Sequence, residues 1–280
     1  MTDPPDPDDE EFEPGHLPPD PDDVEFEPGY LPPDPDEPPP VELWSAVGDI
    51  PPWGTALLLL SWAAVFVTIA FRREIGDPWA LFAWGASAPG LSARDTAWRL
   101  LASTFLHAGV AHVFFNATSM LIFGPAVERI FTRWAFWLVY AAGGTGASLA
   151  SVIWRAARHD AGLSISVGAS GAIFALGGAL LACAYRVRHR LAPGRARALG
   201  AALLFLLGQG LAAGLTRHAT DNVAHAAGIA IGAVLGALIP LSPRLGGPVI
   251  GPAMRVLGTT AAIALAVSLA LAVRGGLTGG

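Results

Sequence analysis

Apolar stretches recur along most of the chain and are separated by shorter polar segments. The stretches cover about residues 54–71, 110–128, 134–154, 170–185, 199–215, 222–241 and 254–273. A hydrocarbon core of about 30 Å requires about 20 consecutive apolar residues per helix, and most of the stretches come close to that length. The pattern predicts seven membrane-spanning helices, and therefore an all-α polytopic membrane protein.

The connection 72–109 is too polar to span a bilayer and too apolar for an ordinary solvated loop. It carries Trp79, Trp84 and Trp98, and tryptophan is enriched at the boundary between bilayer and water. We expect this long connection to lie at the level of the lipid headgroups.

Composition agrees with a membrane protein, since 52% of the residues are hydrophobic and only 14% are charged, against about 25% charged residues in soluble domains. The charge is divided unevenly. Residues 1–50 hold 17 of the 23 acidic residues and no basic one, whereas residues 51–280 hold all 17 basic residues, every one of them arginine. The second part therefore has 23 − 17 = 6 acids and a formal charge of 17 − 6 = +11.

The acidic tail, residues 1–50, contains a tandem repeat at 4–17 and 18–31 (PPDPDDEEFEPGHL and PPDPDDVEFEPGYL). Such a composition cannot bury enough apolar surface to offset the chain entropy lost on folding, so we expect a disordered tail. Its role is either that of a solvated spacer or that of a docking arm anchored by Phe12 and Phe26. Residues 51–275 form the predicted membrane domain.

Orientation is predicted from arginine placement. The segment 186–197 contains five arginines and is the most basic loop, and short basic loops stay in the cytoplasm. This places the N-terminal tail in the cytoplasm and the C-terminus outside. The 72–109 connection becomes an external loop, and the starts of the 170–185 and 222–241 stretches also face outward.

Two polar residues stand near the starts of apolar stretches: Ser170, in GASGA at 168–172, and His225, in AHAAG at 224–228. A polar side chain at membrane depth is costly, so it usually faces the bundle interior and marks a functional site. A serine and a histidine are the minimal pair for an activated hydroxyl nucleophile. On the predicted topology both lie at a similar depth, which favours a serine hydrolase built within the bilayer.

Neighbouring residues strengthen this hypothesis. His112 and Asn116 are four residues apart at the start of the 110–128 stretch and therefore share one helix face. Both can donate hydrogen bonds to a tetrahedral oxyanion, as can the Ser170 amide at a helix N-terminus. Small residues repeat every four positions on the two helices concerned, which lets membrane helices approach closely; they are Gly171, Ala175 and Ala179 on one helix and Gly228, Gly232 and Gly236 on the other.

At this point the sequence resembles the rhomboid family of intramembrane serine proteases. GASGAIFAL around Ser170 is similar to the family's GxSG motif, AHAAGIAIG around His225 to its AHxxGxxxG motif, and HVFFNATSM from His112 to its HxxxN motif. The order and spacing agree over about residues 54–241, and the 254–273 stretch resembles an additional C-terminal helix found in some members. The resemblance implies a rhomboid-like six-helix bundle with one additional C-terminal transmembrane helix.

The resemblance also implies roles. Ser170 would be the nucleophile and His225 the general base and then acid, without a third acid, a metal or an organic cofactor. His112, Asn116 and the Ser170 amide would stabilise the oxyanion. Asp221, one turn before His225, is interpreted instead as a helix N-terminal acid.

Two further motifs carry structural roles in this resemblance. Trp98–Arg99 is similar to the Trp-Arg pair of the family's first external loop, which Arg99 would organise. Gly124 and Glu128 are similar to the GxxxE motif, in which Glu128 would organise the inner end of the 110–128 helix.

The chain departs from the family pattern at two positions. Phe174 stands where many members have a tyrosine stacked on the catalytic histidine, and Thr132 replaces the last glycine of a GxxxExxxG pattern. Neither change removes a catalytic group.

The sequence therefore predicts an intramembrane serine endopeptidase that cleaves transmembrane segments of membrane proteins near the outer face. One alternative is a catalytically silent rhomboid-like escort of membrane proteins, but silent rhomboid-like proteins typically lack the serine or the histidine. The other is a transporter, but the sequence has no matched inverted repeat. The expected location is the bacterial plasma (inner) membrane. The expected partners are transmembrane substrates and the lipid bilayer, without nucleic acid, and the oligomeric state stays open.

Overall fold

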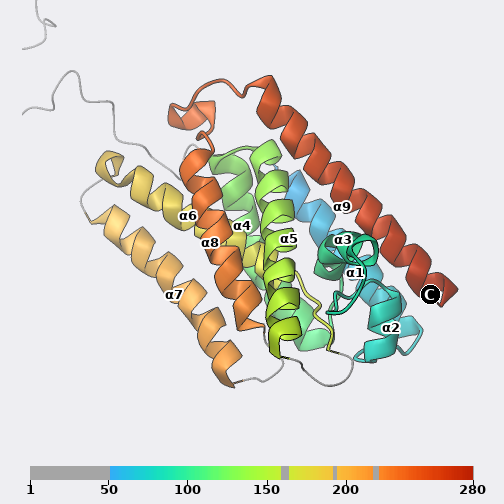
Figure 1. The fold of residues 1–280 in the computed structure, drawn as a ribbon. Helices are drawn as coiled ribbons and strands as arrows, with labels where there is room; N and C mark the ends of the chain where they lie inside the picture. The colour runs from blue at the N-terminus through green and yellow to red at the C-terminus, as the bar shows by residue number, and fades with distance from the viewer. Residues whose placement is uncertain (1–50, 159–163, 192–193, 217–220, 280) are drawn as a thin grey trace, which may run out of the picture. The chain divides into compact units, whose positions relative to one another are not determined.

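The computed structural model describes residues 51–158, 164–191, 194–216 and 221–279 (Figure 1). The predictions for the acidic tail, residues 1–50, lie outside the described residues. Within them, the chain is helical apart from turns and one isolated antiparallel bridge between Ser87 and Ser166. The all-α prediction is confirmed.

Seven long helices occupy the predicted stretches of the described chain. They are α1 (Trp53–Phe71), α4 (Val110–Ile130), α5 (Arg133–Arg158), α6 (Ser170–Arg186), α7 (Arg195–Thr216), α8 (Asn222–Leu238) and α9 (Pro252–Thr278). The short elements are α2 (Pro78–Ala83), α3 (Ala93–Ala102) and single 3-10 turns at Ser103–Phe105, Arg188–Arg190 and Pro243–Leu245.

Two of the long helices are shorter than the rest. By length and composition, α1, α4, α5, α7 and α9 can each cross a membrane, whereas α6 and α8 have 17 residues each. An α-helix of that length extends about 26 Å, a few ångströms less than a hydrocarbon core of about 30 Å. These two short helices carry Ser170 and His225 at their N-terminal ends.

Helices α6 and α8 pack against each other almost backbone to backbone, in the middle of the bundle (Figure 1). A methyl group added at Gly228 would collide with the Gly171 carbonyl oxygen, and one at Gly232 with that of Ala175. Gly171 itself faces the Ala147 side chain of α5. Because glycine removes this steric barrier, the small-residue pattern explains how the two helices approach closely enough for their short polar side chains to meet.

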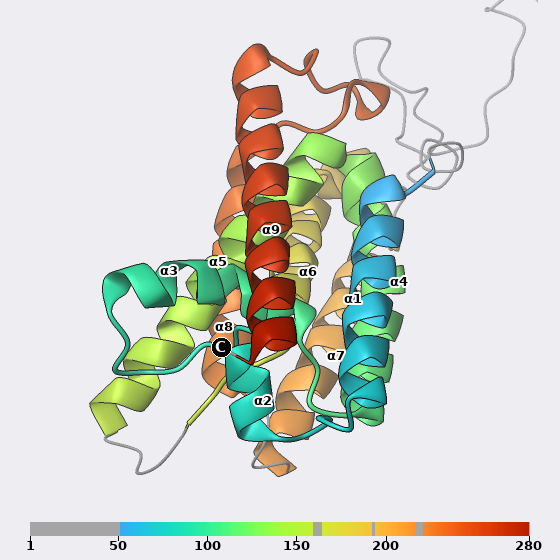
Figure 2. The same cartoon turned by 90° about the vertical axis from the view of Figure 1, so that its right-hand side faces the viewer.

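The 72–109 connection is more ordered than the sequence pattern predicts, because it contains α2, α3 and a 3-10 turn (Figure 2). Trp79 is 69% exposed, as expected for a residue at the bilayer boundary, but Trp84 is 1% exposed. The indole Nε1–H of Trp84 donates to Glu74 (3.0 Å), and its ring packs with Val65, Ile69 and other apolar residues. Trp84 is therefore a core residue of the region formed by the 72–109 connection.

The additional C-terminal helix, α9, runs along α5 and reaches α2 and α3 (Figure 2). Two glycines make this close approach possible. Gly258 faces the backbone of Trp134 in α5, and Gly276 faces the ring of Trp84. Helix α9 thereby supports the 72–109 connection from outside the bundle.

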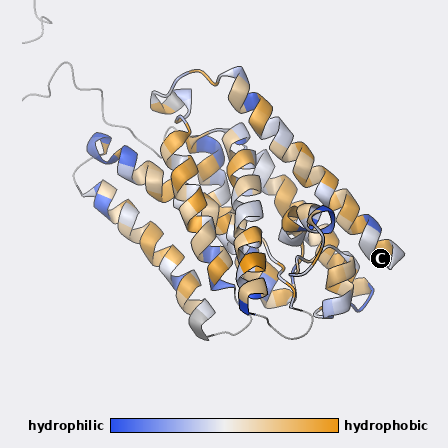
Figure 3. Ribbon diagram, viewed as in Figure 1, coloured by the Kyte–Doolittle hydropathy of each residue, from blue (hydrophilic) through white to orange (hydrophobic). Residues whose placement is uncertain are grey.

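The bundle presents hydrophobic side chains on its outer faces, and the most hydrophilic residues gather near helix ends (Figure 3). Leu60, Phe114, Ile153, Phe205 and Val234, on five different helices, are each at least half exposed. A water-soluble protein rarely shows so much exposed apolar surface on its helices, whereas a bilayer solvates it. The chain is a multi-pass membrane protein.

Candidate active site

Ser170 and His225 meet at the N-terminal ends of α6 and α8. The Ser170 Oγ lies 2.8 Å from the His225 Nε2, a distance at which the hydroxyl can donate a hydrogen bond to an unprotonated nitrogen. Helix α6 begins at Ser170, while Asp221 caps α8 and sets His225 one turn inside that helix. The close packing at Gly171 and Gly228 directly below fixes the distance between the two side chains.

The imidazole of His225 is held by stacking. The Phe174 ring lies parallel to it at 4.1 Å between ring centroids and 18° between planes. His225 is 4% exposed, and its Nδ1 has no hydrogen-bond partner among the described residues. Phe174 therefore orients the ring without needing a hydroxyl group. Within the described chain, no carboxylate hydrogen-bonds to this imidazole.

His112 and Asn116 lie on the first two turns of α4, beside Gly168, which is two residues before that serine. The Ala108 amide donates to the His112 Nδ1 (3.4 Å), so the Nε2 of a neutral ring carries the proton and can donate. Asn116 is 5% exposed, and its Nδ2 has no acceptor among the described residues. A buried amide without a partner is rare, and here it leaves a donor available at the site.

Gly168 connects these two donors to Ser170. Its φ of +122° lies in a region that side chains rarely adopt, and a methyl group there would lie 2.6 Å from the His112 Nε2 and 3.8 Å from the Asn116 Nδ2. The Gly168 amide donates to the Ser103 carbonyl (2.9 Å). Glycine at this position lets the backbone pass next to both donors, and Ser170 follows as the first residue of α6, where amides have no partner within the helix.

Known proteins resemble this chain in sequence. The family model described as the Rhomboid domain matches residues 94–242, which is more than half of the chain. The chain belongs to the rhomboid family. It is 34% identical over 187 residues to Rhomboid protease GluP of Bacillus subtilis (strain 168), covering 67% of this chain and 34% of that protein.

Other rhomboid relatives come from a plant and from the same bacterium. RHOMBOID-like protein 1 of Arabidopsis thaliana is 36% identical over 149 residues, which is 53% of this chain and 36% of that protein. Putative rhomboid protease YdcA of Bacillus subtilis (strain 168) is 39% identical over 84 residues, which is 30% of this chain and 40% of that protein. The chain thus spans less than half the length of these relatives. The resemblance predicted from the motifs is confirmed at the level of the family.

Arg99 lies within the 72–109 connection, on α3, rather than at the dyad. Its guanidinium donates to the carbonyl oxygens of Phe82 and Ala86, and it stacks on the rings of Phe82 and Trp98 at 4.1 and 4.6 Å. Burial lowers the pKa of Arg99, although the nearby Asp95 carboxylate opposes this. These contacts join α2 to α3.

Glu128 lies at the opposite end of the bundle and binds the N-terminus of α1. Its carboxylate accepts hydrogen bonds from the Gly54 amide (2.9 Å), the Thr55 amide (2.7 Å) and the Thr55 hydroxyl (2.7 Å). A carboxylate is stabilised at a helix N-terminus, where free amides and the helix dipole point towards it. Glu128 therefore joins α4 to α1.

Thr132 replaces the last glycine of the GxxxExxxG pattern and adopts a backbone conformation that favours glycine. Its φ is +149°, a conformation that glycine adopts without strain and β-branched residues avoid. The threonine offers a partial compensation, because its Oγ1 accepts a hydrogen bond from the Ala135 amide (3.3 Å) at the start of α5. The departure from the family pattern is thus a local strain far from the dyad.

A polar cluster around Asp221 was not predicted from the sequence. Its carboxylate accepts hydrogen bonds from the Ser151 hydroxyl, the Ala224 amide (3.0 Å) and the Ser166 hydroxyl (3.2 Å), and forms an ion pair with Arg155 (3.2 Å). Arg155 also donates to the Ser164 hydroxyl (2.7 Å). The cluster therefore joins α5, the N-terminus of α8 and the segment that leads to Ser170. Only the position of Asp221 one turn before His225 was visible in the sequence.

We predict that Asp221→Asn lowers both stability and activity. Burial opposes the charged form of Asp221, but the hydrogen bonds from Ser151 and Ala224 and the charge of Arg155 outweigh it, so the pKa of Asp221 lies below its ordinary value. The ion pair therefore stabilises the protein at neutral pH, and this contribution is lost as the pH falls below about 4. We expect a loss of about 1–3 kcal/mol at pH 7, measured by thermal unfolding in detergent.

The exposed carboxylate of Asp95 provides a control, because Asp95→Asn removes the same charge from an exposed site. It should cost less than about 1 kcal/mol. If Asp221→Asn is as stable as the parent at pH 7, the cluster does not stabilise the site. The pair is tested further by combining Asp221→Asn with Arg155→Gln, whose effects should be less than additive.

His107 is a second residue to which the sequence assigned no function. It is 1% exposed, and its ring contacts those of Trp62 and His112 at 5.3 and 5.2 Å. Burial, together with the neighbouring His112, lowers the pKa of His107 to about 3, although the Phe105 carbonyl opposes this. The ring is therefore neutral at ordinary pH and packs against His112, so it supports the position of that donor.

Proposed function

We propose that this rhomboid is an intramembrane serine endopeptidase that cleaves transmembrane segments of membrane proteins near the outer face of the bilayer. The observation that carries the proposal is the 2.8 Å contact between the Ser170 Oγ and the His225 Nε2. It is supported by the donors of His112 and Asn116, which lie next to Gly168, two residues before that serine. Two of its relatives bear the names Rhomboid protease GluP and Putative rhomboid protease YdcA.

In the proposed reaction, the Ser170 Oγ attacks the carbonyl carbon of the scissile peptide while His225 Nε2 takes the hydroxyl proton. The carbonyl oxygen becomes an oxyanion that accepts hydrogen bonds from His112, Asn116 and the Ser170 amide. The C–N bond then breaks, and the leaving amine takes the proton from His225. Water, deprotonated by His225, hydrolyses the acyl-enzyme and releases the carboxylate product and the free serine.

The proposed orientation places the dyad towards the outer face and the N-terminus in the cytoplasm of a bacterial plasma (inner) membrane. Arginines at the end of the bundle opposite Ser170 support it, since cytoplasmic loops are enriched in arginine. Several arginines at the dyad end are partnered: Arg72 pairs with Glu74, Arg155 pairs with Asp221, and Arg99 binds carbonyl groups. Because these arginines are neutralised or hydrogen-bonded, their presence at the dyad end argues less strongly against the proposed orientation than a count of arginines in the sequence does.

The decisive experiment reconstitutes the full chain in liposomes with a fluorogenic transmembrane peptide. We expect cleavage of the peptide within its apolar segment, located by mass spectrometry of the products. We also expect covalent labelling of Ser170 by a fluorophosphonate, which needs an activated serine. A chain that is folded and binds the peptide, but neither cleaves it nor reacts with the probe, would support the silent escort instead.

A further inference from the structure

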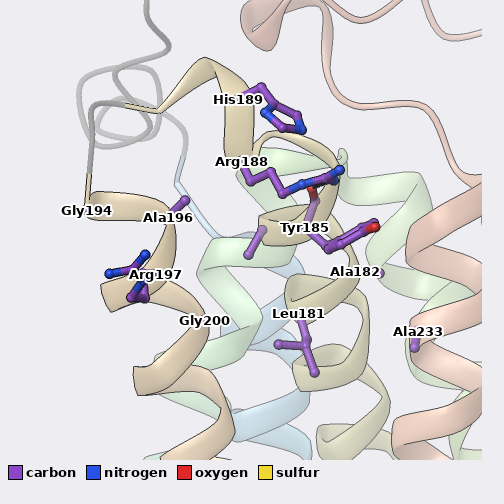
Figure 4. A pocket seen from close by; sticks show the side chains of 11 residues that line it. Leu181, Ala182, Tyr185, Arg188, His189, Gly194, Ala196, Arg197, Gly200 and Ala233 are labelled. Carbon is purple, nitrogen blue, oxygen red and sulfur yellow. Dashed lines mark hydrogen bonds between the residues drawn. The ribbon is translucent and has the colours of Figure 1, made fainter.

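A groove opens between α6, α7 and α8 at the end of the bundle opposite Ser170. It has a volume of about 760 Å³. Its walls are apolar and small, and include Leu181 and Ala182 of α6, Gly200 of α7 and Ala233 of α8 (Figure 4). Its rim carries Arg188 and Arg197, which are labelled on opposite sides of the groove in Figure 4.

The groove exists because α7 packs on α6 along only part of its length. Towards the dyad end, Gly210 lies against the Phe174 ring, and Leu207, which is buried, lies against Gly177. Nearer the N-terminus of α7, a methyl group added at Gly200 would meet no atom within 4 Å. Gly200 therefore leaves an open apolar wedge between α6 and α7 near their basic ends.

The two arginines at the rim differ from the neighbouring Arg186 and Arg190, which hydrogen-bond to distant parts of the described chain. Arg186 donates to the carbonyl oxygens of Gly236 and Ile239, and Arg190 to that of Leu245, so these two link helix ends. Arg188 makes one such bond, to the Tyr185 carbonyl (2.6 Å). Because a guanidinium has five N–H donors, most of its donors stay free. For Arg197, no ion pair is present within the described residues.

The described part of the chain offers no carboxylate to balance this rim. Its acidic residue at this end is Glu128, whose oxygens are engaged by Gly54 and Thr55. The groove thus combines two positive charges at the rim with an apolar interior. An apolar wedge that opens towards a bilayer is filled by hydrocarbon, because an empty void would lose its dispersion contacts.

We propose that this groove binds one anionic phospholipid. The phosphate diester accepts hydrogen bonds from Arg188 and Arg197, and an acyl chain lies along the apolar walls formed by Leu181, Gly200 and Ala233. Basic pockets between transmembrane helices on the cytoplasmic side are suited to anionic headgroups. The bound lipid fills the groove between α6 and α7, and so fixes the inner half of α7. This site is separate from the dyad and does not depend on the proposed protease activity.

The test measures binding to the full chain in a neutral detergent, with phosphatidylglycerol as the anionic probe and phosphatidylcholine as the zwitterionic comparison. Native mass spectrometry counts bound lipid, and thermal unfolding reports its effect on stability. We expect one retained phosphatidylglycerol and a higher unfolding temperature, with neither effect from phosphatidylcholine. Inorganic phosphate at the same concentration should have no effect, because it lacks the acyl chains.

Three variants distinguish a site from general attraction to a basic surface. Arg188→Gln with Arg197→Gln should weaken phosphatidylglycerol binding about 30-fold, each arginine contributing about a factor of five. Arg195→Gln, which removes a charge two residues from Arg197 but outside the groove, should leave binding within about two-fold of the parent. Gly200→Leu keeps every charge, fills the open wedge and should also abolish the shift in unfolding temperature.

Other outcomes would overturn the proposal. Equal losses in the Arg195 variant and the double variant would mean that lipid binds by surface charge alone. Stabilisation by inorganic phosphate equal to that by the lipid would mean a phosphate site. Unchanged binding in Gly200→Leu, or no retained lipid in the parent, would mean that no acyl chain occupies the groove.

Discussion

Replacing Ser170 by alanine, or His225 by alanine, is expected to remove proteolysis, with a fall in kcat of at least about 10⁴-fold for either change. The reason is the geometry of one hydrogen bond. The Ser170 Oγ is 2.8 Å from the His225 Nε2, and a serine hydroxyl is a weak nucleophile unless a base takes its proton during attack. The measurement is the initial rate of peptide cleavage in liposomes.

Two readouts separate a loss of chemistry from a loss of folding. Fluorophosphonate labelling should vanish in both variants, whereas the unfolding temperature should stay close to that of the parent. The matched controls are Ser61→Ala, whose hydroxyl bonds only the Leu57 carbonyl within its own helix, and His189→Ala, an exposed histidine at the opposite end of the bundle. Both controls should keep the parent rate within about two-fold.

Residual activity distinguishes the roles of the two side chains. The double variant should be no slower than either single variant, because the two residues act as one unit. Full activity in Ser170→Ala would contradict the nucleophile assignment. Activity retained by His225→Ala but lost by Ser170→Ala would mean that another group activates the serine.

The positions of the membrane helices could be predicted from hydropathy alone, since α1, α4 and α5 begin within a residue of the expected stretches. The candidate dyad could also be predicted, because a serine and a histidine at the same depth are rare in apolar helices. The spacing of Gly228 and Gly232 explains the contact between α6 and α8. These features depend on the order of residues within one helix and on the preference of apolar residues for the bilayer. A single sequence is enough to read both.

The features that could not be predicted depend on contacts between distant segments. Trp84 resembles a boundary tryptophan in sequence, yet it is buried because α9, almost 200 residues later, covers it with Gly276. Asp221 resembles an ordinary helix cap, yet Arg155 and Ser151 of α5 converge on its carboxylate. Hydropathy and spacing carry no information about such partners.

The proposed hydrolysis of a peptide bond also gives a reason for the short length of α6 and α8. Both helices begin at the dyad, and both have 17 residues. Hydrolysis needs water, and a helix about 26 Å long does not reach across a hydrocarbon core of about 30 Å. If the ends of α6 and α8 opposite the dyad lie at the cytoplasmic boundary, Ser170 and His225 lie below the outer surface yet close enough for water to reach them.

Removal of the oxyanion donors is expected to slow cleavage without weakening substrate binding. His112→Ala or Asn116→Ala should each lower kcat by about 10²–10³-fold. Both donors lie next to Gly168 and the start of α6, and the Asn116 Nδ2 has no acceptor among the described residues. An oxyanion forms only after Ser170 attacks, so the missing bond affects the transition state and leaves KM nearly unchanged.

Thr118→Ala provides the control on the same helix, because this exposed hydroxyl bonds only the Phe114 carbonyl. Asn116 is buried, so its variant must also be compared with the parent by thermal unfolding. Combining His112→Ala with Asn116→Ala should cost less than the product of the two effects, since the Ser170 amide still serves the oxyanion. A raised KM with an unchanged kcat would instead make the two residues part of the substrate-binding site, because a group that binds substrate and transition state equally cannot accelerate the chemical step.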